Sequence, residues 1–188
     1  TETIWLGIDP GVSGGICAVA VDTAGKMRMT AVKMPRDEKE LLNTLAKDFW
    51  KKILKTGNDV SFFAFVEQQV PRPTLMSGHV SVLPSTCILF ANYQAIKVGL
   101  IANGIDFEVV SPKLWQRRYT CFKSAVNTKR KLSRSEWKSV LKALASRIWA
   151  REKKKATLWS ADATLIVMDG MCRQKILSEC LLSRLLQD

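Results

Sequence analysis

The segment from Trp5 to Gly15, WLGIDPGVSGG, constrains the fold more than any other part of the chain. The apolar run Ile4–Ile8 suits a buried strand, and Pro10 with the glycines suits a tight reversal into a second strand at 16–21. Asp9 is therefore expected at the end of a strand, on a rigid support that faces an open edge of a sheet. That position suits a carboxylate that holds a metal ion.

Two further acids occur in similar settings. Glu67 follows the apolar run 61–66, and Asp162 lies in the apolar, helix-like run 160–168. Three buried carboxylates that converged would repel one another unless a cation joined them, and hard oxygen ligands suit Mg²⁺ or Mn²⁺. We therefore predict that Asp9, Glu67 and Asp162 are catalytic metal ligands, which clamp two ions for in-line attack on a phosphodiester.

Each acid taken alone has a plainer explanation. Asp9 suits a turn-former that bonds its own backbone, Glu67 a surface acid at a strand end, and Asp162 a helix N-cap. All three explanations would have to hold together to dismiss the metal site, so the combination favours the metal-binding interpretation.

The positive charge of the chain is concentrated in one segment. The 188 residues are 47% apolar, which predicts a single globular domain over residues 1–188. Of the net charge of +12, the segment Pro112–Lys155 holds 15 Lys or Arg and two acids, and the rest nets −1. This asymmetry is typical of nucleic-acid binding. A solvated basic helix face or a polybasic membrane patch is the alternative.

The basic segment and one loop supply the expected DNA contacts. In the segment, the phosphate-binding candidates are Lys113, Arg117, Arg118, Lys123, Lys129, Arg130, Lys131 and Arg134. Trp115, Tyr119 and Phe122 interleave with this charge and suit stacking on opened bases, although core packing is favoured for Trp115. The loop 71–84 follows Glu67 and should border the cleft, which makes Arg72 and His79 further DNA-binding candidates.

Composition also bears on compartment. Five cysteines without a CxxC pair indicate free thiols in a reducing compartment and argue against zinc. No apolar run is expected to cross a bilayer, because the best candidate, Leu158–Met171, is short and contains two Asp. The first residues resemble a strand, so we expect any targeting presequence to be absent from this chain.

Hydrophobic periodicity predicts the order β-β-β-α-β-α-β-α-α. After the first two strands we expect elements at 26–34, 37–55, 61–66, 85–103, 107–110, 135–151 and 160–188, the last broken near Gly170. Antiparallel pairing of three strands followed by helical crossovers gives an α/β fold of ribonuclease H-like order, a mixed five-stranded sheet with flanking helices. The helix at 85–103 is apolar on more than one face, so it is either central or at a subunit contact.

Four motifs carry a resemblance to a known family. They are GIDPGVSGG (Gly7–Gly15), VEQ (Val66–Gln68), FEVVSPKLWQRRY (Phe107–Tyr119) and KKK…ADATLIV (Lys153–Val167). In order and coverage the chain resembles RuvC-type Holliday junction resolvases, and most of all the plastid branch, the monokaryotic chloroplast resolvases.

The resemblance implies a homodimer, formed through the helix at 85–103, that makes symmetric paired nicks in four-way DNA junctions. It implies two Mg²⁺ or Mn²⁺ ions per active site, held by Asp9, Glu67 and Asp162, and neither a nucleotide cofactor nor a membrane partner. It favours a chloroplast location, with the mitochondrion second.

Two departures from the family pattern stand out. The family places an acid or a histidine three or four residues before the last Asp, where this chain has Leu158 and Trp159. Ser160 is a weak ligand. Either another residue compensates, with Asp169 as the candidate, or turnover is slow, or this copy is altered.

The second departure is Gln116, which follows Trp115 where a basic residue is usual. Lys113, Arg117 or Arg118 is expected to supply the missing charge.

Three other functions compete with a resolvase. A non-catalytic junction or branched-DNA binding protein would explain the missing fourth residue. A different nuclease of the same fold would act on RNA–DNA hybrids or flaps. An actin-like kinase or ATPase is disfavoured, because the chain is too short for a duplicated fold and has no second phosphate loop.

Overall fold

The computed structural model describes residues 2–22, 24–57, 59–70, 74–76, 79–81, 84–123, 132–150, 152 and 155–187. Its central sheet has the strands β1 (Glu2–Ile8), β2 (Gly15–Val21), β3 (Met27–Lys33), β4 (Val60–Glu67) and β7 (Asp106–Val110). The order is β3-β2-β1-β4-β7. The first three strands pair antiparallel, while β4 runs parallel to both β1 and β7. The predicted mixed five-stranded sheet is confirmed.

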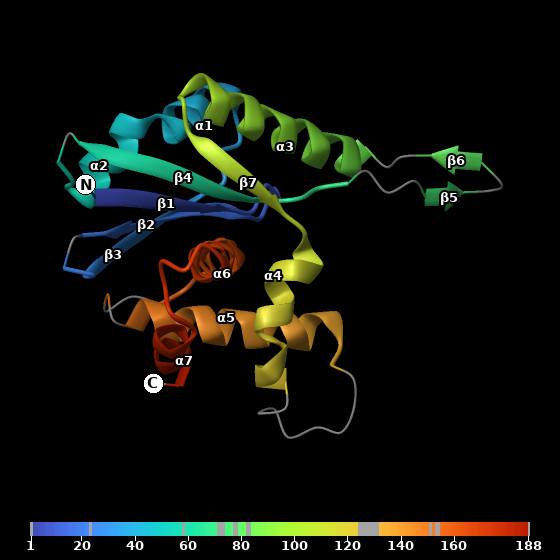
Figure 1. Cartoon of the computed structure of the whole chain (residues 1–188). Helices are drawn as coiled ribbons and strands as arrows, with labels where there is room; N and C mark the ends of the chain where they lie inside the picture. The colour runs from blue at the N-terminus through green and yellow to red at the C-terminus, as the bar shows by residue number, and fades with distance from the viewer. Residues whose placement is uncertain are drawn as a thin grey trace.

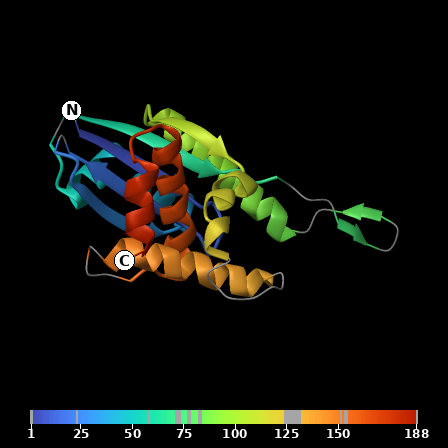
Figure 2. The same ribbon diagram turned by 60° about the horizontal axis from the view of Figure 1, so that its bottom comes forward.

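Helices cover both faces of this sheet. They are α1 (Glu38–Leu45), α2 (Lys47–Leu54), α3 (Pro84–Ala102), α4 (Pro112–Arg118), α5 (Arg134–Ala150), α6 (Leu158–Arg173) and α7 (Glu179–Gln187). Helices α1 to α3 lie on one face and α4 to α7 on the other (Figure 1), so each face has its own apolar core. A 3-10 turn, η1 (Thr120–Lys123), follows α4, and α5 crosses α6 and α7 on the outside (Figure 2).

A short hairpin lies in the segment that was expected to be a loop. Strands β5 (Thr74–Met76) and β6 (His79–Ser81) pair antiparallel. The hairpin projects from the body beyond the end of β4, as both ribbon views show (Figures 1 and 2).

Three helix boundaries differ from the prediction. The expected helix 37–55 is two helices, because Ala46 is extended (φ −65°, ψ 135°), although Asp37 does cap the first by accepting the Glu40 N–H. The last helical region begins earlier, at the N-cap Thr157. Its break follows Arg173 rather than Gly170, because Gly170 is buried against the Phe65 ring.

Helix α6 is buried nearly all round, and two glycines allow it to approach the sheet closely. A Cβ at Gly7 of β1 would lie 2.2 Å from the carbonyl oxygen of Ala163 and 2.7 Å from the Val167 nitrogen. A Cβ at Gly170 would lie 2.3 Å from the Phe65 ring. Figure 1 shows α6 end-on between the sheet and α5. Backbone-to-backbone contact therefore fixes the depth of α6 against the strand that carries Asp9.

Helix α3 is buried on one side only. Tyr93, Ile96, Gly99 and Leu100 are buried, whereas Ile88, Val98 and Ile101 are 56%, 63% and 67% exposed. It is the one helix in the described ranges with the length and apolar composition to cross a membrane, contrary to the expectation of no such run. Its length and composition are weak support for a membrane span, because its buried face packs on α1 and the sheet core.

We predict that Gly7→Ala lowers the melting temperature, because the added methyl group would overlap the backbone of α6. Overpacking of this kind costs about 1–3 kcal/mol, and each kcal/mol corresponds to about 2–4 °C in a chain of this size. Gly57→Ala is the matched control, since a Cβ at Gly57 meets nothing within 4 Å. Equal melting temperatures for the two variants would contradict the close approach.

Candidate active site

Asp9 is fixed by the turn that follows β1. Its backbone N–H donates to the Gly15 carbonyl (3.0 Å), and its Oδ1 accepts the Gly11 N–H (3.0 Å). Gly14 lies against the same carboxylate, and a Cβ there would be 2.6 Å from Cγ. Asp9 is thus a turn-former, and the same turn holds its carboxylate at the end of the sheet.

Glu67 ends β4, the parallel neighbour of β1. The register pairs Ile8 with Val66, so the residues that follow, Asp9 and Glu67, leave the sheet side by side. Both carboxylate oxygens of Glu67 accept a hydrogen bond, Oε1 from Trp115 Nε1 (2.9 Å) and Oε2 from Gln69 Nε2 (3.0 Å).

Asp162 lies in the second turn of α6, which begins after its N-cap Thr157. The N-cap explanation for Asp162 is therefore wrong. The neighbouring residue Ala163 contacts Gly7, so Asp162 comes to the same end of the sheet as Asp9.

The three acids line one cleft of about 470 Å³. Its other wall comes from α5, which contributes Arg134, Trp137, Lys138 and Leu141. The structure thus brings together the acids that the sequence singled out.

Burial and mutual repulsion disfavour the ionised forms of these acids. Burial first, and then the charges of Asp9 and Asp162, raise the pKa of Glu67 to about 7 against the hydrogen bonds from Trp115 and Gln69. Burial and the Asp9 charge raise the pKa of Asp162 to about 6. Burial also raises the pKa of Asp9, opposed by the Gly11 N–H and by Lys138.

The donor chemistry fits a hard divalent cation, because three oxygen-only ligands repel one another in one cleft. In the ranges that the structure describes, no three His, Cys, Asp or Glu side chains are grouped closely enough to hold a metal ion. The fit is therefore one of ligand type and charge rather than of a closed coordination shell.

Among the residues that the structure describes, no fourth acid lines the cleft. Leu158 is 69% exposed, and Trp159 packs on Gly15, where a Cβ would be 2.9 Å from Trp159 Cε3. The expectation that Asp169 compensates is wrong. Asp169 is 1% exposed and accepts hydrogen bonds from Arg118 Nε (2.6 Å) and Arg173 Nε (2.9 Å).

Lys138 is a cleft residue that the sequence reasoning missed. Its charge lowers the pKa of both Asp9 and Asp162 against the effect of burial. Arg134, four residues earlier, lines the same cleft. The i, i+4 spacing on a basic helix was the available signal, but it did not distinguish Lys138 from its neighbours.

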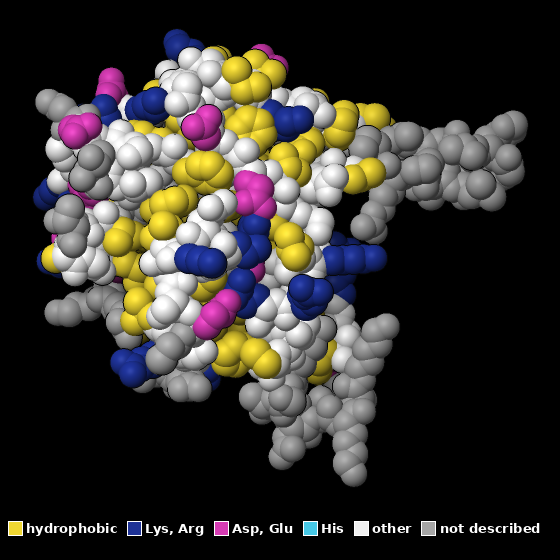
Figure 3. Space-filling view, viewed as in Figure 1, with side chains coloured by type: hydrophobic (Ala, Val, Ile, Leu, Met, Phe, Trp, Pro, Cys, Tyr) yellow, Lys and Arg dark blue, Asp and Glu magenta, His cyan; other side chains and the backbone are white. Residues whose placement is uncertain are grey.

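The expected DNA contacts have different surroundings. Lys113 and Arg117 are exposed on α4 and Arg134 on α5. Arg118 is ion-paired with Asp169 and Glu179, and its side chain is 18% exposed. Figure 3 shows Lys and Arg side chains gathered over α4.

The other candidates cannot be compared with the structure. Arg72, Lys129, Arg130 and Lys131 lie outside the described residues, as do the side chains of His79 and Lys123.

The expectation that the interleaved aromatic residues of the basic segment stack on DNA bases is wrong for Tyr119. Trp115 and Tyr119 are 0% exposed, and the Tyr119 hydroxyl donates to the Leu165 carbonyl (2.8 Å). Phe122 is partly buried against the same core. The core-packing alternative for Trp115 is confirmed.

Comparisons with known proteins identify the fold. No protein-family model and no curated protein matches the chain. Thermus thermophilus RuvC in complex with a Holliday junction substrate matches with a TM-score of 0.55 at 15% identity, over 92% of this chain and 96% of that chain. Another Thermus thermophilus RuvC structure matches at 0.50 and 14%, with the same shares.

At these identities the likeness shows the fold alone, the ribonuclease H-like architecture of RuvC. The crystal structure of the yeast mitochondrial Holliday junction resolvase Ydc2 matches at 0.38 and 16%, over 96% of this chain and 80% of that chain.

We predict that Asp162→Asn stabilises the metal-free protein at pH 8. The pKa of Asp162 lies at about 6 in the fold and 3.8 ordinarily, so between these values the folded state holds a proton that the unfolded chain releases. Stability therefore falls as pH rises through this window and stays lower above it. Asn removes that loss, so its melting temperature should exceed the wild-type value by about 2–4 °C per kcal/mol relieved.

The difference in melting temperature between Asp162→Asn and wild type should shrink below pH 6. Melting curves in EDTA at pH 5 and pH 8 measure it, with Asp48→Asn as the control because the Asp48 side chain is 95% exposed. A destabilised Asp162→Asn at pH 8 would contradict the proposed repulsion.

Proposed function

We propose that this chain is a divalent-metal-dependent DNA endonuclease that resolves four-way junctions. The observation that carries the proposal is the convergence of Asp9, Glu67 and Asp162 on one cleft with a cationic opposite wall. The fold adds support, because it is shared with RuvC, which has been solved with a Holliday junction substrate.

The chemistry follows from the two walls of the cleft. Asp9, Glu67 and Asp162 would hold Mg²⁺ or Mn²⁺, two ions per site, which when bound would activate water and neutralise charge on the scissile phosphate. Arg134 and Lys138 on α5 suit a phosphate oxygen as their ligand and would hold the DNA strand against the carboxylates. The position after Trp115 carries no charge, because it is occupied by Gln116. The Gln116 side chain accepts a hydrogen bond from Trp137 Nε1 (3.1 Å).

DNA would lie along the basic segment. Lys113, Arg117 and Arg134 are exposed on α4 and α5 and suit phosphate contacts, which give affinity without base information. Arg118 is less suited, because its guanidinium already binds two carboxylates. Lys123, Lys129, Arg130 and Lys131 stay predictions, as do Arg72 and His79.

A homodimer would provide two cuts in one junction. The exposed apolar residues Ile88, Val98 and Ile101 of α3 suit a contact with a second copy of the chain. The plastid-branch assignment and the chloroplast location stay predictions from the sequence motifs.

A non-catalytic junction-binding protein is the second candidate, favoured by one specific observation. The positions before Asp162 hold the exposed Leu158 and the packed Trp159 instead of a fourth catalytic group. Incubation of a synthetic four-way junction with the protein and Mg²⁺ or Mn²⁺ separates the two functions. Paired nicks support the resolvase, whereas binding without nicks supports the second candidate. Competition by RNA–DNA hybrids and flaps tests the remaining nuclease alternative.

We predict that Asp9→Asn abolishes cleavage but leaves junction affinity within a few-fold of wild type. The change removes a metal ligand and keeps the phosphate contacts, and the Asn oxygen can still accept the Gly11 N–H. Gel-shift binding in EDTA and nicking in Mn²⁺ measure the two effects. Mg²⁺-dependent nicking by Asp9→Asn would remove Asp9 from the catalytic set.

We also predict that changing Lys129, Arg130 and Lys131 to Gln weakens junction binding and flattens its salt dependence. Each lost phosphate contact should reduce the slope of log K against log salt by about 0.9. Fluorescence anisotropy at several salt concentrations measures the slope.

The charge-matched control changes Lys26, Lys39 and Lys52 to Gln, three exposed lysines outside the basic segment. Equal slopes for the two triple variants would mean that residues 129–131 do not contact DNA.

A further inference from the structure

Helix α4 connects the two elements that carry Glu67 and Asp162. From the middle of this helix, Trp115 donates to Glu67 at the end of β4 (Nε1 to Oε1, 2.9 Å). At its end, Arg118 binds Asp169 of α6 (2.6 Å), and Tyr119 donates to the α6 carbonyl of Leu165 (2.8 Å). Helix α4 therefore links strand β4 and helix α6, which supply two of the three cleft acids.

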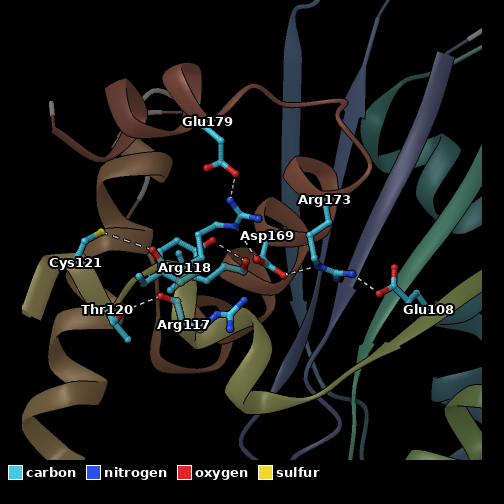
Figure 4. A network of polar contacts seen from close by, with 10 residues as sticks. Glu108, Arg117, Arg118, Thr120, Cys121, Asp169, Arg173 and Glu179 are labelled. Carbon is cyan, nitrogen blue, oxygen red and sulfur yellow. Dashed lines mark hydrogen bonds and ion pairs between the residues drawn. The ribbon is translucent and has the colours of Figure 1, made fainter.

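A network of ion pairs joins the end of α4 to α6. Asp169 is buried and accepts from both Arg118 and Arg173, which in turn pair with Glu179 and Glu108 (Figure 4). Removing one partner of a buried ion pair such as this strongly destabilises the folded protein. This network holds α4 against α6, while β7 leads directly into α4 through the N-cap Ser111.

The Trp115 ring has little freedom to turn. It is 0% exposed, and its ring centroid lies 6.3 Å from that of Tyr119 at an interplanar angle of 67°. The indole N–H is a donor only, and its acceptor is a carboxylate that faces the cleft. The direction of this N–H, together with the Gln69 amide on the other oxygen, therefore sets how the Glu67 carboxylate is turned.

Burial of a tryptophan in this fold does not by itself give its indole N–H a carboxylate partner. Among the described residues, Trp5 and Trp50 bury indole nitrogens that have no hydrogen-bond partner. The Trp149 N–H donates to the Thr164 hydroxyl at the same 2.9 Å distance, away from the cleft. The Trp115 N–H, by contrast, is directed to an acid of the cleft.

We infer that Trp115 is a positioning residue that orients the Glu67 carboxylate for a divalent cation, with α4 as its support. The inference rests on the proposed function, because it assigns a role within the proposed metal site. Partners that orient metal ligands typically change metal affinity by about 10–100-fold when removed.

The first test is a calorimetric titration with Mn²⁺ at pH 8. Trp115→Phe, which removes the donor and keeps an aromatic ring, should weaken Mn²⁺ binding about 10–100-fold without changing junction affinity in EDTA. Trp149→Phe is the matched control and should bind Mn²⁺ within about 2-fold of wild type, because it loses a buried N–H bond of the same length. In a Glu67→Gln background, Trp115→Phe should cause no further loss of Mn²⁺ affinity.

The second test does not depend on the stability of Trp115→Phe or on activity. The six tryptophans give indole N–H signals in a ¹⁵N–¹H spectrum, and sequential assignment of the wild-type spectrum identifies those of Trp115 and Trp149. In Glu67→Gln, a neutral acceptor replaces the carboxylate, so the Trp115 signal should move while that of Trp149 stays in place. The Trp115 signal should also move when Mg²⁺ is added to wild type.

The outcomes separate the two proposals. If wild type nicks junctions but Trp115→Phe binds Mn²⁺ as tightly as Trp149→Phe, the inference is overturned and the proposed function stands. A Trp115 signal that ignores Glu67→Gln also overturns the inference. If wild type neither binds Mn²⁺ nor nicks a junction, the proposed function fails and the inference fails with it.

Discussion

The contact of α6 with the sheet at Gly7 is the constraint on which the rest of the structure depends. A hydrogen atom instead of a methyl group at this position lets the Ala163 carbonyl approach β1. Gly7 lies two residues before Asp9, and Ala163 directly follows Asp162. One backbone contact therefore sets both the depth of the core beneath the sheet and the separation of two acids far apart in the sequence.

Convergence of the acids opposes folding stability. Burial and like charge raise the pKa of Glu67 to about 7 and that of Asp162 to about 6, so ionised carboxylates are held in an unfavourable environment. A chain selected only for stability would have no reason to bring these groups together, because strained, destabilised sites are a recurrent cost of function. The rest of the fold offsets this cost with two apolar cores and the Asp169 network.

Contacts outside the cleft engage both Trp159 and Asp169, the two residues that stand where a fourth catalytic group was sought. Trp159 packs on Gly15, at the end of the turn that follows Asp9, and Asp169 is enclosed by two arginines. Neither side chain lines the cleft, and α5 instead brings Arg134 and Lys138 to its opposite wall. The electrostatic balance of the cleft thus depends on a helix that the motif comparison did not single out.

The sequence by itself determined the sheet, most of its helices and the three acids, because strand periodicity, turn residues and isolated acids are local signals. It also favoured core packing for Trp115. Only the tertiary structure decided that Asp9 and Glu67 emerge side by side, that Arg118 and Asp169 pair within the fold, that Tyr119 is buried, and that Lys138 faces the cleft. These outcomes depend on strand register and helix packing between distant segments, which no short stretch of sequence encodes.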